Sequence, residues 1–546
     1  MLKVEGSTAN LARDVDDVMR PSELVQEWLS TCVSQHELCR KPFHGKGDII
    51  EQSVDHIPPR RLIQTFEFCW GVKLPKRRLV EDAFLLRAPY VVLSHCWGST
   101  DKRPLCTTRD NFAMHRRHMA WHQFPQTFQD AIQLCMEMSI QYLWIDSLCI
   151  IQDDEDDWRL ESANMANIYE RALFTIAASS AVNSTEGLFK VRKSLNLVEI
   201  PYNDPEGERT DPVLFFIEPD LGKCLSTSPL NQRAWVMQEY FLSRRTVHLT
   251  TQGIIWSCKN GKRPHTRHMT SEFGSSWEEV FEDEWSRLVQ SYTRRELTYK
   301  SDKLVAIEGL ATRFQSRGEE SGYRQGLFER HMPHDLLWYG EGRLLRDVGN
   351  GIPSWSWAST TGPISFKASV FENAETFHAK IAPRSYRDFE VKENLPFDSI
   401  LYMNALVRRI DNLEGPLQCQ AFCYEDVQDM GFSGRMHEDY KNGSINVAPT
   451  FALLSDGKKV GWGVFDEHGK SGGDVFCLPL MKQRVWEGFA LSKEPHFLWA
   501  LLVSPAVFIE DYMGMDGCEW YQRVGWGLHF VPSWFDELIV RDICLV

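Results

Sequence analysis

Two glutamates lie on apolar helical stripes, where a carboxylate either finds a partner or takes up a proton. Glu239 lies four residues after Trp235 in the segment PLNQRAWVMQEYFLSRRTVHL. Glu161 lies three residues after Trp158 in the segment DDEDDWRLESANMANIYERA. Burial raises the pKa of an unpaired carboxyl group, and such groups often serve in catalysis. The spacing leaves two interpretations of each glutamate open, a buried salt bridge with an arginine or a catalytic group.

A second set of polar side chains follows segments that we expect to be buried strands. In YVVLSHCWGS, the apolar run from Tyr90 to Leu93 gives way to serine, histidine, cysteine and tryptophan. Ligands of open α/β sheets gather where strands end in this way, and an ordinary loop is the alternative. We expect Ser94, Trp97 and Asp146 to border one cleft. Together with residues of the helices, the candidates for substrate binding are Ser94, His95, Trp97, Asp146, Glu161, Ser179 and Trp235.

Other catalytic chemistries are less well supported by the sequence. Ser94 or Ser179 would be the nucleophile of a Ser–His–Asp hydrolase, but the sequence has no G-x-S-x-G turn. Neither a G-x-x-x-x-G-K-[ST] phosphate loop nor a G-x-G-x-x-G dinucleotide fingerprint occurs. Cys96 follows His95 directly, and neighbouring side chains of a strand point to opposite faces. The sequence therefore predicts neither P-loop NTP hydrolysis nor a cysteine–histidine pair.

One cysteine cluster raises the question of a metal. Cys32, His36 and Cys39 have helical spacing in TCVSQHELCRK, and Cys419 and Cys423 form a second close pair. A structural zinc ion needs four ligands at close spacings. The helix around Cys32 has a complete apolar face without a metal, and buried cysteines usually behave as small hydrophobes. We therefore expect no metal site.

The candidate residues need strands and helices that bring them together. Between residues 78 and 260, short apolar segments alternate with amphipathic ones, the pattern of an α/β fold. We predict a mostly parallel sheet that is flanked by helices and whose strands are connected by right-handed crossovers. We expect Tyr90–Leu93 and Tyr142–Ile145 to be adjacent strands at the centre of this sheet. The predicted strands are Tyr90–Leu93, Tyr142–Ile145, Leu173–Ala177 and Thr246–Leu249.

The chain has 546 residues, which is too long for one hydrophobic core. Residues 1–77 are expected to form a helical lead-in that ends near a Pro-Pro break. Residues 261–546 contain Trp-rich turns and short alternating runs, which indicate a β-rich α+β domain. We expect this C-terminal domain to have a regulatory or sensing role.

Charge and composition limit the classes of partner. The net charge of −15 argues against a nucleic-acid binder, because phosphate contacts need clustered lysine and arginine. The first residues lack the apolar region of a secretory signal, and no apolar run of about 18 residues predicts a membrane span. The 14 cysteines are scattered, as in proteins that keep reduced thiols. We expect a cytoplasmic protein without nucleic-acid or membrane partners.

Three blocks of the sequence resemble the signature blocks of the fungal heterokaryon-incompatibility (HET) domain. They are YVVLSHCWG, YLWIDSLCIIQDDEDDWRLESANMANIYERALFTIAASSA and RAWVMQEYFLSRRTVHL. The resemblance covers about residues 78–258, and His95 stands where the family usually has tyrosine. It implies an effector of regulated cell death or non-self recognition, in heterokaryon incompatibility or innate immunity.

The same region also resembles a distant Toll/interleukin-1 receptor (TIR) domain. YVVLS and LWIDSL resemble its first two strands, and RAWVMQE resembles its Trp-x-x-x-Glu helix. In TIR enzymes that glutamate serves NAD cleavage, and the resemblance thus assigns the catalytic role to Glu239. NAD would be a substrate rather than a cofactor, so the missing dinucleotide fingerprint is no objection.

The resemblance leaves two functions to distinguish. The first is an NAD glycohydrolase, a hydrolase acting on N-glycosyl bonds, in which Glu239 stabilises an oxocarbenium-like ribose and Glu161 has a supporting or structural role through an ion pair. The alternative is a non-catalytic HET signalling scaffold that recruits partners. Both predict self-association, and a protein partner is the expected trigger.

Overall fold

The computed structural model divides the described residues of the chain into two units. The N-terminal unit comprises Met1–Asp283, Arg295–Thr298 and Val305–Arg313, and the remainder forms the C-terminal unit. The structure describes residues 20–40, 58–81, 88–189, 197–200, 213–216, 221–264, 285–315, 322–341, 345–346, 351–366, 374–376, 379–381, 400–414, 450–466, 474–484, 496–506, 519–530, 532–536 and 538–546.

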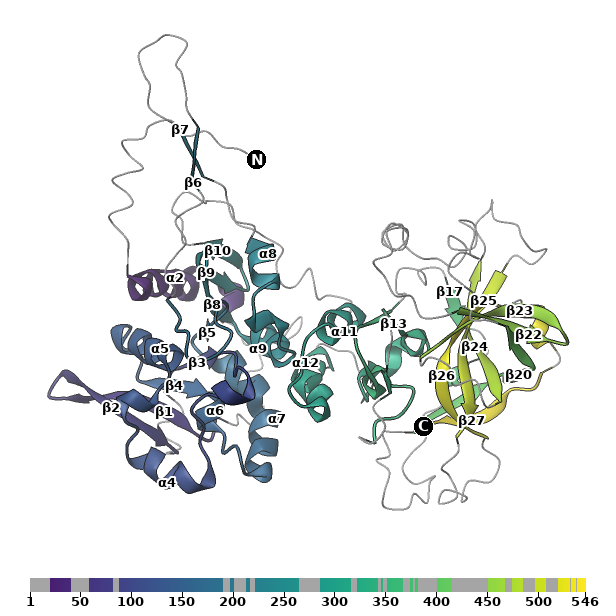
Figure 1. Cartoon of the computed structure of the whole chain (residues 1–546), viewed down its shortest axis with the longest axis horizontal. Coiled ribbons are helices and arrows are strands. Elements are labelled where there is room, and N and C mark those ends of the chain that lie inside the picture. Colours follow the sequence, from purple (N-terminus) through teal and green to yellow (C-terminus); the bar gives the residue numbers. More distant parts are fainter. Residues whose placement is uncertain are drawn as a thin grey trace, which may run out of the picture. The chain divides into compact units, whose positions relative to one another are not determined.

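The N-terminal unit contains a mixed eight-stranded sheet in the order β10-β9-β8-β5-β3-β4-β1-β2 (Figure 1). Its four central strands, β8, β5, β3 and β4, are parallel to one another. Antiparallel strands extend the sheet on both sides. The strands are β1 (Leu62–Cys69), β2 (Val72–Val80), β3 (Tyr90–Ser94), β4 (Tyr142–Ile145), β5 (Thr175–Ala177), β8 (Arg245–Thr250), β9 (Gly253–Cys258) and β10 (Gly261–Pro264).

The apolar runs that predicted the central strands are buried on both faces. Every residue of β3 and of β4 is buried, as expected for parallel strands covered by helices. The two strands pair in parallel, with Tyr90 opposite Tyr142 and Leu93 opposite Ile145. The prediction of an α/β fold with these two strands adjacent and central is confirmed. The expectation of a mostly parallel sheet is wrong, because only the pairings among β8, β5, β3 and β4 are parallel and the hairpins at both ends are antiparallel.

The sheet extends further toward the N-terminus than we expected. Residue 78, the expected domain start, lies inside β2, and the helical part of the lead-in consists of α2 (Pro21–Gln35) and α3 (Glu37–Arg40) among the described residues. The turn between β1 and β2 consists of Trp70 and Gly71, which both have positive φ, at 51° and 82°. Two-residue hairpin turns of this kind usually contain Asn-Gly or Asp-Gly, so Trp-Gly gave no turn signal.

Crossover helices cover the sheet. Helix α5 (Gln126–Glu137) connects β3 to β4, and α7 (Glu155–Arg171) connects β4 to β5 on the other side of β3. Because the two connections run in opposite directions, right-handed crossovers place α5 and α7 on opposite faces of the sheet. An aspartate caps the start of α7, because the Asp154 side chain accepts a hydrogen bond from the backbone N–H of Asp157.

The remaining helices of the N-terminal unit are shorter. Helix α9 directly precedes β8 and contacts α7. None of the described helices has the length and apolar character needed to cross a membrane. These elements are α4 (Arg109–Arg117), α6 (Asp146–Cys149), α8 (Leu221–Ser226), α9 (Trp235–Leu242) and most of α12 (Val305–Gln315), with a separate strand pair β6 (Leu197–Ile200) and β7 (Val213–Phe216).

The C-terminal unit is β-rich, as predicted. Its main sheet has eleven strands in the described part of the chain, and its core includes Leu453, Cys477, Leu502 and Phe530. Helix α11 (Trp285–Thr293) lies at its start. The strands of the main sheet are β17 (Ala374–Thr376), β18 (Lys380–Ile381), β19 (Leu401–Ala405), β20 (Arg408–Ile410), β21 (Asn412–Glu414), β22 (Thr450–Ser455), β23 (Lys458–Phe465), β24 (Val475–Arg484), β25 (His496–Pro505), β26 (Glu519–Phe530) and β27 (Arg541–Leu545).

Candidate functional site

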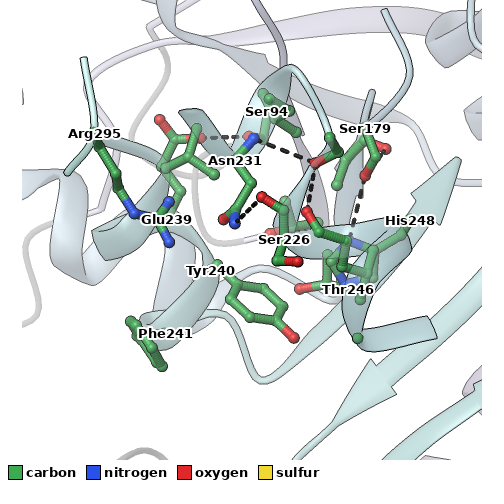
Figure 2. A pocket seen from close by; sticks show the side chains of 17 residues that line it. Ser94, Ser179, Ser226, Asn231, Glu239, Tyr240, Phe241, Thr246, His248 and Arg295 are labelled. Atoms are coloured by element: carbon green, nitrogen blue, oxygen red, sulfur yellow. Dashed lines mark hydrogen bonds between the residues drawn. The ribbon is translucent and has the colours of Figure 1, made fainter. Parts of the chain in front are cut away.

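A cavity of about 170 Å³ lies at the carboxyl ends of β3 and β5 and alongside β8 in the N-terminal unit (Figure 2). Strands β3 and β5 are neighbours whose crossovers run in opposite directions, and such a switch point is where open α/β sheets bind ligands. The register of these strands brings Ser94, Ala177 and His248 side by side in one wall of the cavity, because Ser94 pairs with Ala177 and Ala177 pairs with His248. Thr175 and Thr246 form the preceding row of the same face.

Helix α9 supplies the opposite wall of the cavity. Val236, Glu239 and Tyr240 line it from positions i, i+3 and i+4, which share one face of a helix. Trp235, a predicted binding residue, begins the helix but is not among the lining residues. The rest of the lining comes mainly from residues 222–231 and from Arg295.

Glu239 is buried and held by hydroxyl groups. Its Oε2 accepts a hydrogen bond of 2.5 Å from the Ser94 hydroxyl, and the Tyr169 hydroxyl of α7 also hydrogen-bonds to it. Burial raises the pKa of Glu239, and the positive charge of Arg233 and the bond from Ser94 partly oppose this shift. The residue is a fixed, water-poor carboxylate at the switch point of the sheet.

Arginine side chains supply positive charge at the same end of the cavity. Figure 2 shows Arg295 beside Glu239. Burial lowers the pKa of Arg295 to about 10, and the negative charge of Glu239 opposes this shift. The Arg233 side chain donates a hydrogen bond to the backbone carbonyl of His95. The backbone carbonyl oxygen of Arg233 accepts a hydrogen bond of 3.5 Å from the Arg295 side chain. The two guanidinium groups favour the ionised form of Glu239.

The other end of the cavity contains a histidine. His248 Nδ1 lies 3.4 Å from the Ser179 hydroxyl, and its Nε2 lies 3.1 Å from the Ser257 hydroxyl. The Tyr240 ring meets the imidazole edge-on, with 5.2 Å between ring centroids. A catalytic triad has a carboxylate on the second histidine nitrogen, where His248 has a hydroxyl group. The arrangement therefore differs from that of a Ser–His–Asp hydrolase.

The structure divides the residues predicted at the strand ends between the two faces of the sheet. Ser94 and Ser179 line the cavity with Glu239. His95 follows Ser94 and points the other way, where its ring packs edge-on against Phe128 of α5 at 4.9 Å. Burial lowers the pKa of His95 to about 4, so the imidazole is neutral at pH 7. The alternation of strand side chains therefore separates Ser94 from its neighbour.

Trp97 and Asp146 belong to the same second group. The indole Nε1 of Trp97 donates to Asp146 Oδ2 at 2.8 Å, and the other carboxylate oxygen lies 3.7 Å from His95 Nδ1. Neither residue is among those that line the cavity. The expected single cleft of Ser94, Trp97 and Asp146 is thus replaced by a cavity at Ser94 and a separate polar contact at the end of β4.

Glu161 lies outside the cavity and differs from our expectation of an ion pair. Its Oε1 accepts the backbone N–H of Arg60 at 3.4 Å, whereas the Arg61 guanidinium binds Asp157 instead. Glu161 is only 1% exposed, and burial raises its pKa to about 7, with the Arg61 charge opposing the shift. This carboxyl group has a structural place in the fold, and burial favours its protonated, neutral form.

Replacing Glu161 with glutamine should flatten the dependence of stability on pH. The folded pKa of about 7 exceeds the ordinary value of 4.5, so the folded protein holds a proton that the unfolded chain has released. In the wild type, the contribution of Glu161 to the free energy of unfolding should fall by about 3 kcal/mol between about pH 4.5 and pH 7. Urea denaturation of both proteins across this range measures the difference. Parallel pH profiles of the two proteins would contradict the prediction.

Several cavity residues were not predicted from the sequence. Thr246 and His248 are polar residues at alternate positions of a buried strand, a signal that indicates one shared face. Asn231 and Arg295 carry no local signal, because their neighbours in the cavity come from distant segments. The Ser94–Glu239 bond likewise joins residues far apart in the chain.

Comparison with known proteins identifies the central part of the N-terminal unit. Residues 90–239 match the family model described as Heterokaryon incompatibility protein (HET). No curated protein and no solved structure matches the chain significantly. The match begins at β3, which bears Ser94, and ends at Glu239, so the two hydrogen-bonded residues lie near its two ends. The chain therefore carries a HET domain, which supports a function in heterokaryon incompatibility and cell death.

Proposed function

We propose that the cavity of the HET domain cleaves NAD at the nicotinamide N-glycosidic bond, with Glu239 as the catalytic residue. The observation that carries the proposal is a buried carboxylate of raised pKa, bonded to Ser94 and placed at the switch point of the sheet. Perturbed carboxylates in cavities are candidates for catalysis. The TIR-like pattern Trp-x-x-x-Glu supports the same residue.

The reaction would proceed by heterolysis of the glycosidic C–N bond. Nicotinamide leaves with the bonding electron pair, and positive charge develops on the ribose ring as in sugar hydrolysis. The Glu239 carboxylate stabilises this charge, or orders the ribose hydroxyls, in a site with little water. Water then adds to the ribose carbon and releases a proton, which gives nicotinamide and ADP-ribose. Nicotinamide is a good leaving group, so the step needs no general acid.

The size of the cavity limits how NAD would bind. A volume of about 170 Å³ is smaller than the roughly 300 Å³ at the lower end of sites for whole drug-sized ligands. The cavity would therefore hold the nicotinamide and its ribose, while the adenosine part lies outside the opening. Tyr240 and Phe241 offer aromatic surface to the nicotinamide ring.

In this proposal, consumption of NAD is the cell-death activity of the protein. Self-association would activate the HET domain, and a protein partner would provide the trigger. The non-catalytic alternative keeps self-association and partner recruitment but needs neither the ionised carboxylate nor an accessible cavity.

The direct test is incubation of the purified full-length protein with NAD over a wide range of protein concentrations. We expect nicotinamide release that rises more than linearly with protein concentration, measured by chromatography. The second product in the same chromatogram would distinguish linear from cyclic ADP-ribose. If no nicotinamide forms and calorimetry detects no NAD binding, the catalytic proposal is wrong and the scaffold function is favoured.

A further inference from the structure

Four buried metal-ligand side chains meet in the N-terminal unit, away from the cavity. They are Cys32, His36, Cys39 and Cys258, and their ligand atoms all lie within 4.8 Å of one another. All four side chains are buried, and the three cysteines are not in disulfide bonds. Such a set of thiols and one imidazole matches the Cys₃His ligand set of structural zinc sites.

The spacing of the ligand atoms agrees with a tetrahedral ion. Zinc lies about 2.3 Å from thiolate sulfur and about 2.0 Å from imidazole nitrogen, so two such atoms on a tetrahedron are about 3.5 Å apart. The Sγ of Cys258 and the Nδ1 of His36 are separated by 3.5 Å. This pair therefore has the spacing of a tetrahedral site, and the other ligand atoms lie within 4.8 Å of it.

Different parts of the fold deliver the ligands. Cys32 lies in the last turn of α2, and His36 follows that helix with an extended backbone (φ −92°, ψ 101°). Cys39 lies in the short helix α3. Cys258 is the last residue of β9, onto which α2 packs through the rings of Trp28 and Trp256 at 6.2 Å. The cluster thus joins the N-terminal helices to an edge region of the sheet.

A buried arginine next to the cluster supports bound thiolates. Arg245 lies opposite Cys258 in the β8–β9 register, and its Nε lies 3.2 Å from Cys32 Sγ. Its other nitrogens donate to the carbonyl oxygens of Cys39 and Leu173. A zinc ion with three thiolates and a neutral imidazole has a net charge of −1, which the guanidinium offsets. With neutral thiols, this buried cation would have no ion-pair partner among the described residues.

We propose that Cys32, His36, Cys39 and Cys258 bind one zinc ion as a structural site. The argument from sequence against a metal took the cysteines near the N-terminus as small hydrophobes of an apolar helix face, whereas the fold brings Cys258 to Cys32, His36 and Cys39 as a fourth ligand. Cys419 and Cys423, the other close pair, lie outside the described residues. With four protein ligands the site has no open position, so the ion holds the helices on the sheet and takes no part in NAD chemistry.

The test is the metal content of the full-length protein, purified under reducing conditions without chelator. We expect about one zinc ion per chain by mass spectrometry of the metal. Cobalt exchanged into the protein should show the absorption bands of a tetrahedral thiolate site. Cys258→Ser should reduce the zinc content by a factor of about five or more, because a structural site depends on all its ligands.

Two further variants separate loss of the site from loss of the fold. His36→Cys replaces one zinc ligand by another and should retain the ion, since Cys₄ sites are also tetrahedral. Cys135→Ser, at a buried cysteine of α5 outside the cluster, should retain it as well. A wild-type protein without zinc that takes up no cobalt would overturn the proposal. So would a disulfide within the cluster, or a Cys258→Ser variant with the zinc content of the wild type.

Discussion

Glu239→Gln should lower kcat/KM for NAD cleavage by a factor on the order of 10² or more while leaving the fold intact. Glutamine keeps the shape of the side chain and an oxygen that can accept the 2.5 Å bond from Ser94. It removes the negative charge that would face the developing ribose cation. Nicotinamide release from wild type and variant at equal concentration measures the effect, and circular dichroism checks the fold.

Glu170→Gln is a matched control for this prediction. Glu170 is another buried carboxylate of the N-terminal unit, bonded to Arg313 at 2.8 Å, and it does not line the cavity. Glutamine can still accept from that arginine, so NAD cleavage should remain within about twofold of the wild type. Wild-type turnover in a folded Glu239→Gln protein would rule out Glu239 as the catalytic residue.

The pH dependence of NAD cleavage provides a separate test of the role of Glu239. The proposed mechanism needs ionised Glu239, and burial raises the pKa of this group. The rate should therefore fall toward acid at a higher pH than it would for an ordinary glutamate. If protonation of Glu239 causes this fall in rate, the low residual activity of Glu239→Gln should not show it.

Arg523→Met should lower the free energy of unfolding of the C-terminal unit by about 3–5 kcal/mol. Arg523 is completely buried and holds Asp466 with two hydrogen bonds, of 2.9 and 3.1 Å. Its guanidinium also stacks on the Trp338 ring at 3.5 Å and donates to the Trp338 carbonyl oxygen at 2.6 Å. The variant leaves the Asp466 carboxylate buried without its cation, which is the main cost.

Urea denaturation measures this loss, and hydrogen exchange of the β26 amides assigns it to the C-terminal unit. Arg541→Met is the matched control, because the Arg541–Glu519 pair is half-exposed and should contribute less than about 1 kcal/mol. Replacing Asp466 by leucine in the Arg523→Met protein should recover part of the loss, because the buried carboxylate is removed as well. Equal effects of Arg523→Met and Arg541→Met would contradict the prediction.

Local patterns in the sequence determined the central part of the HET domain. Strands β3 and β4 follow from short apolar runs, and α5 and α7 follow from helical spacing, with an aspartate cap at the start of α7. Glu239 was identified because a carboxylate on an apolar stripe signals burial whatever the partner. Such signals are local, since hydrophobic periodicity and capping involve residues within a few positions of one another.

Only the tertiary structure decided which polar residues share a site. The register of β3, β5 and β8 placed Ser94 and His248 in one wall of the cavity, and helix α9 placed Glu239 against Ser94 from the opposite wall. Strand alternation sent His95 to the other face of the sheet. Cys258 joined Cys32 in the same way, through the antiparallel extension of the sheet. Contacts between distant segments depend on strand order and register, which no local periodicity encodes.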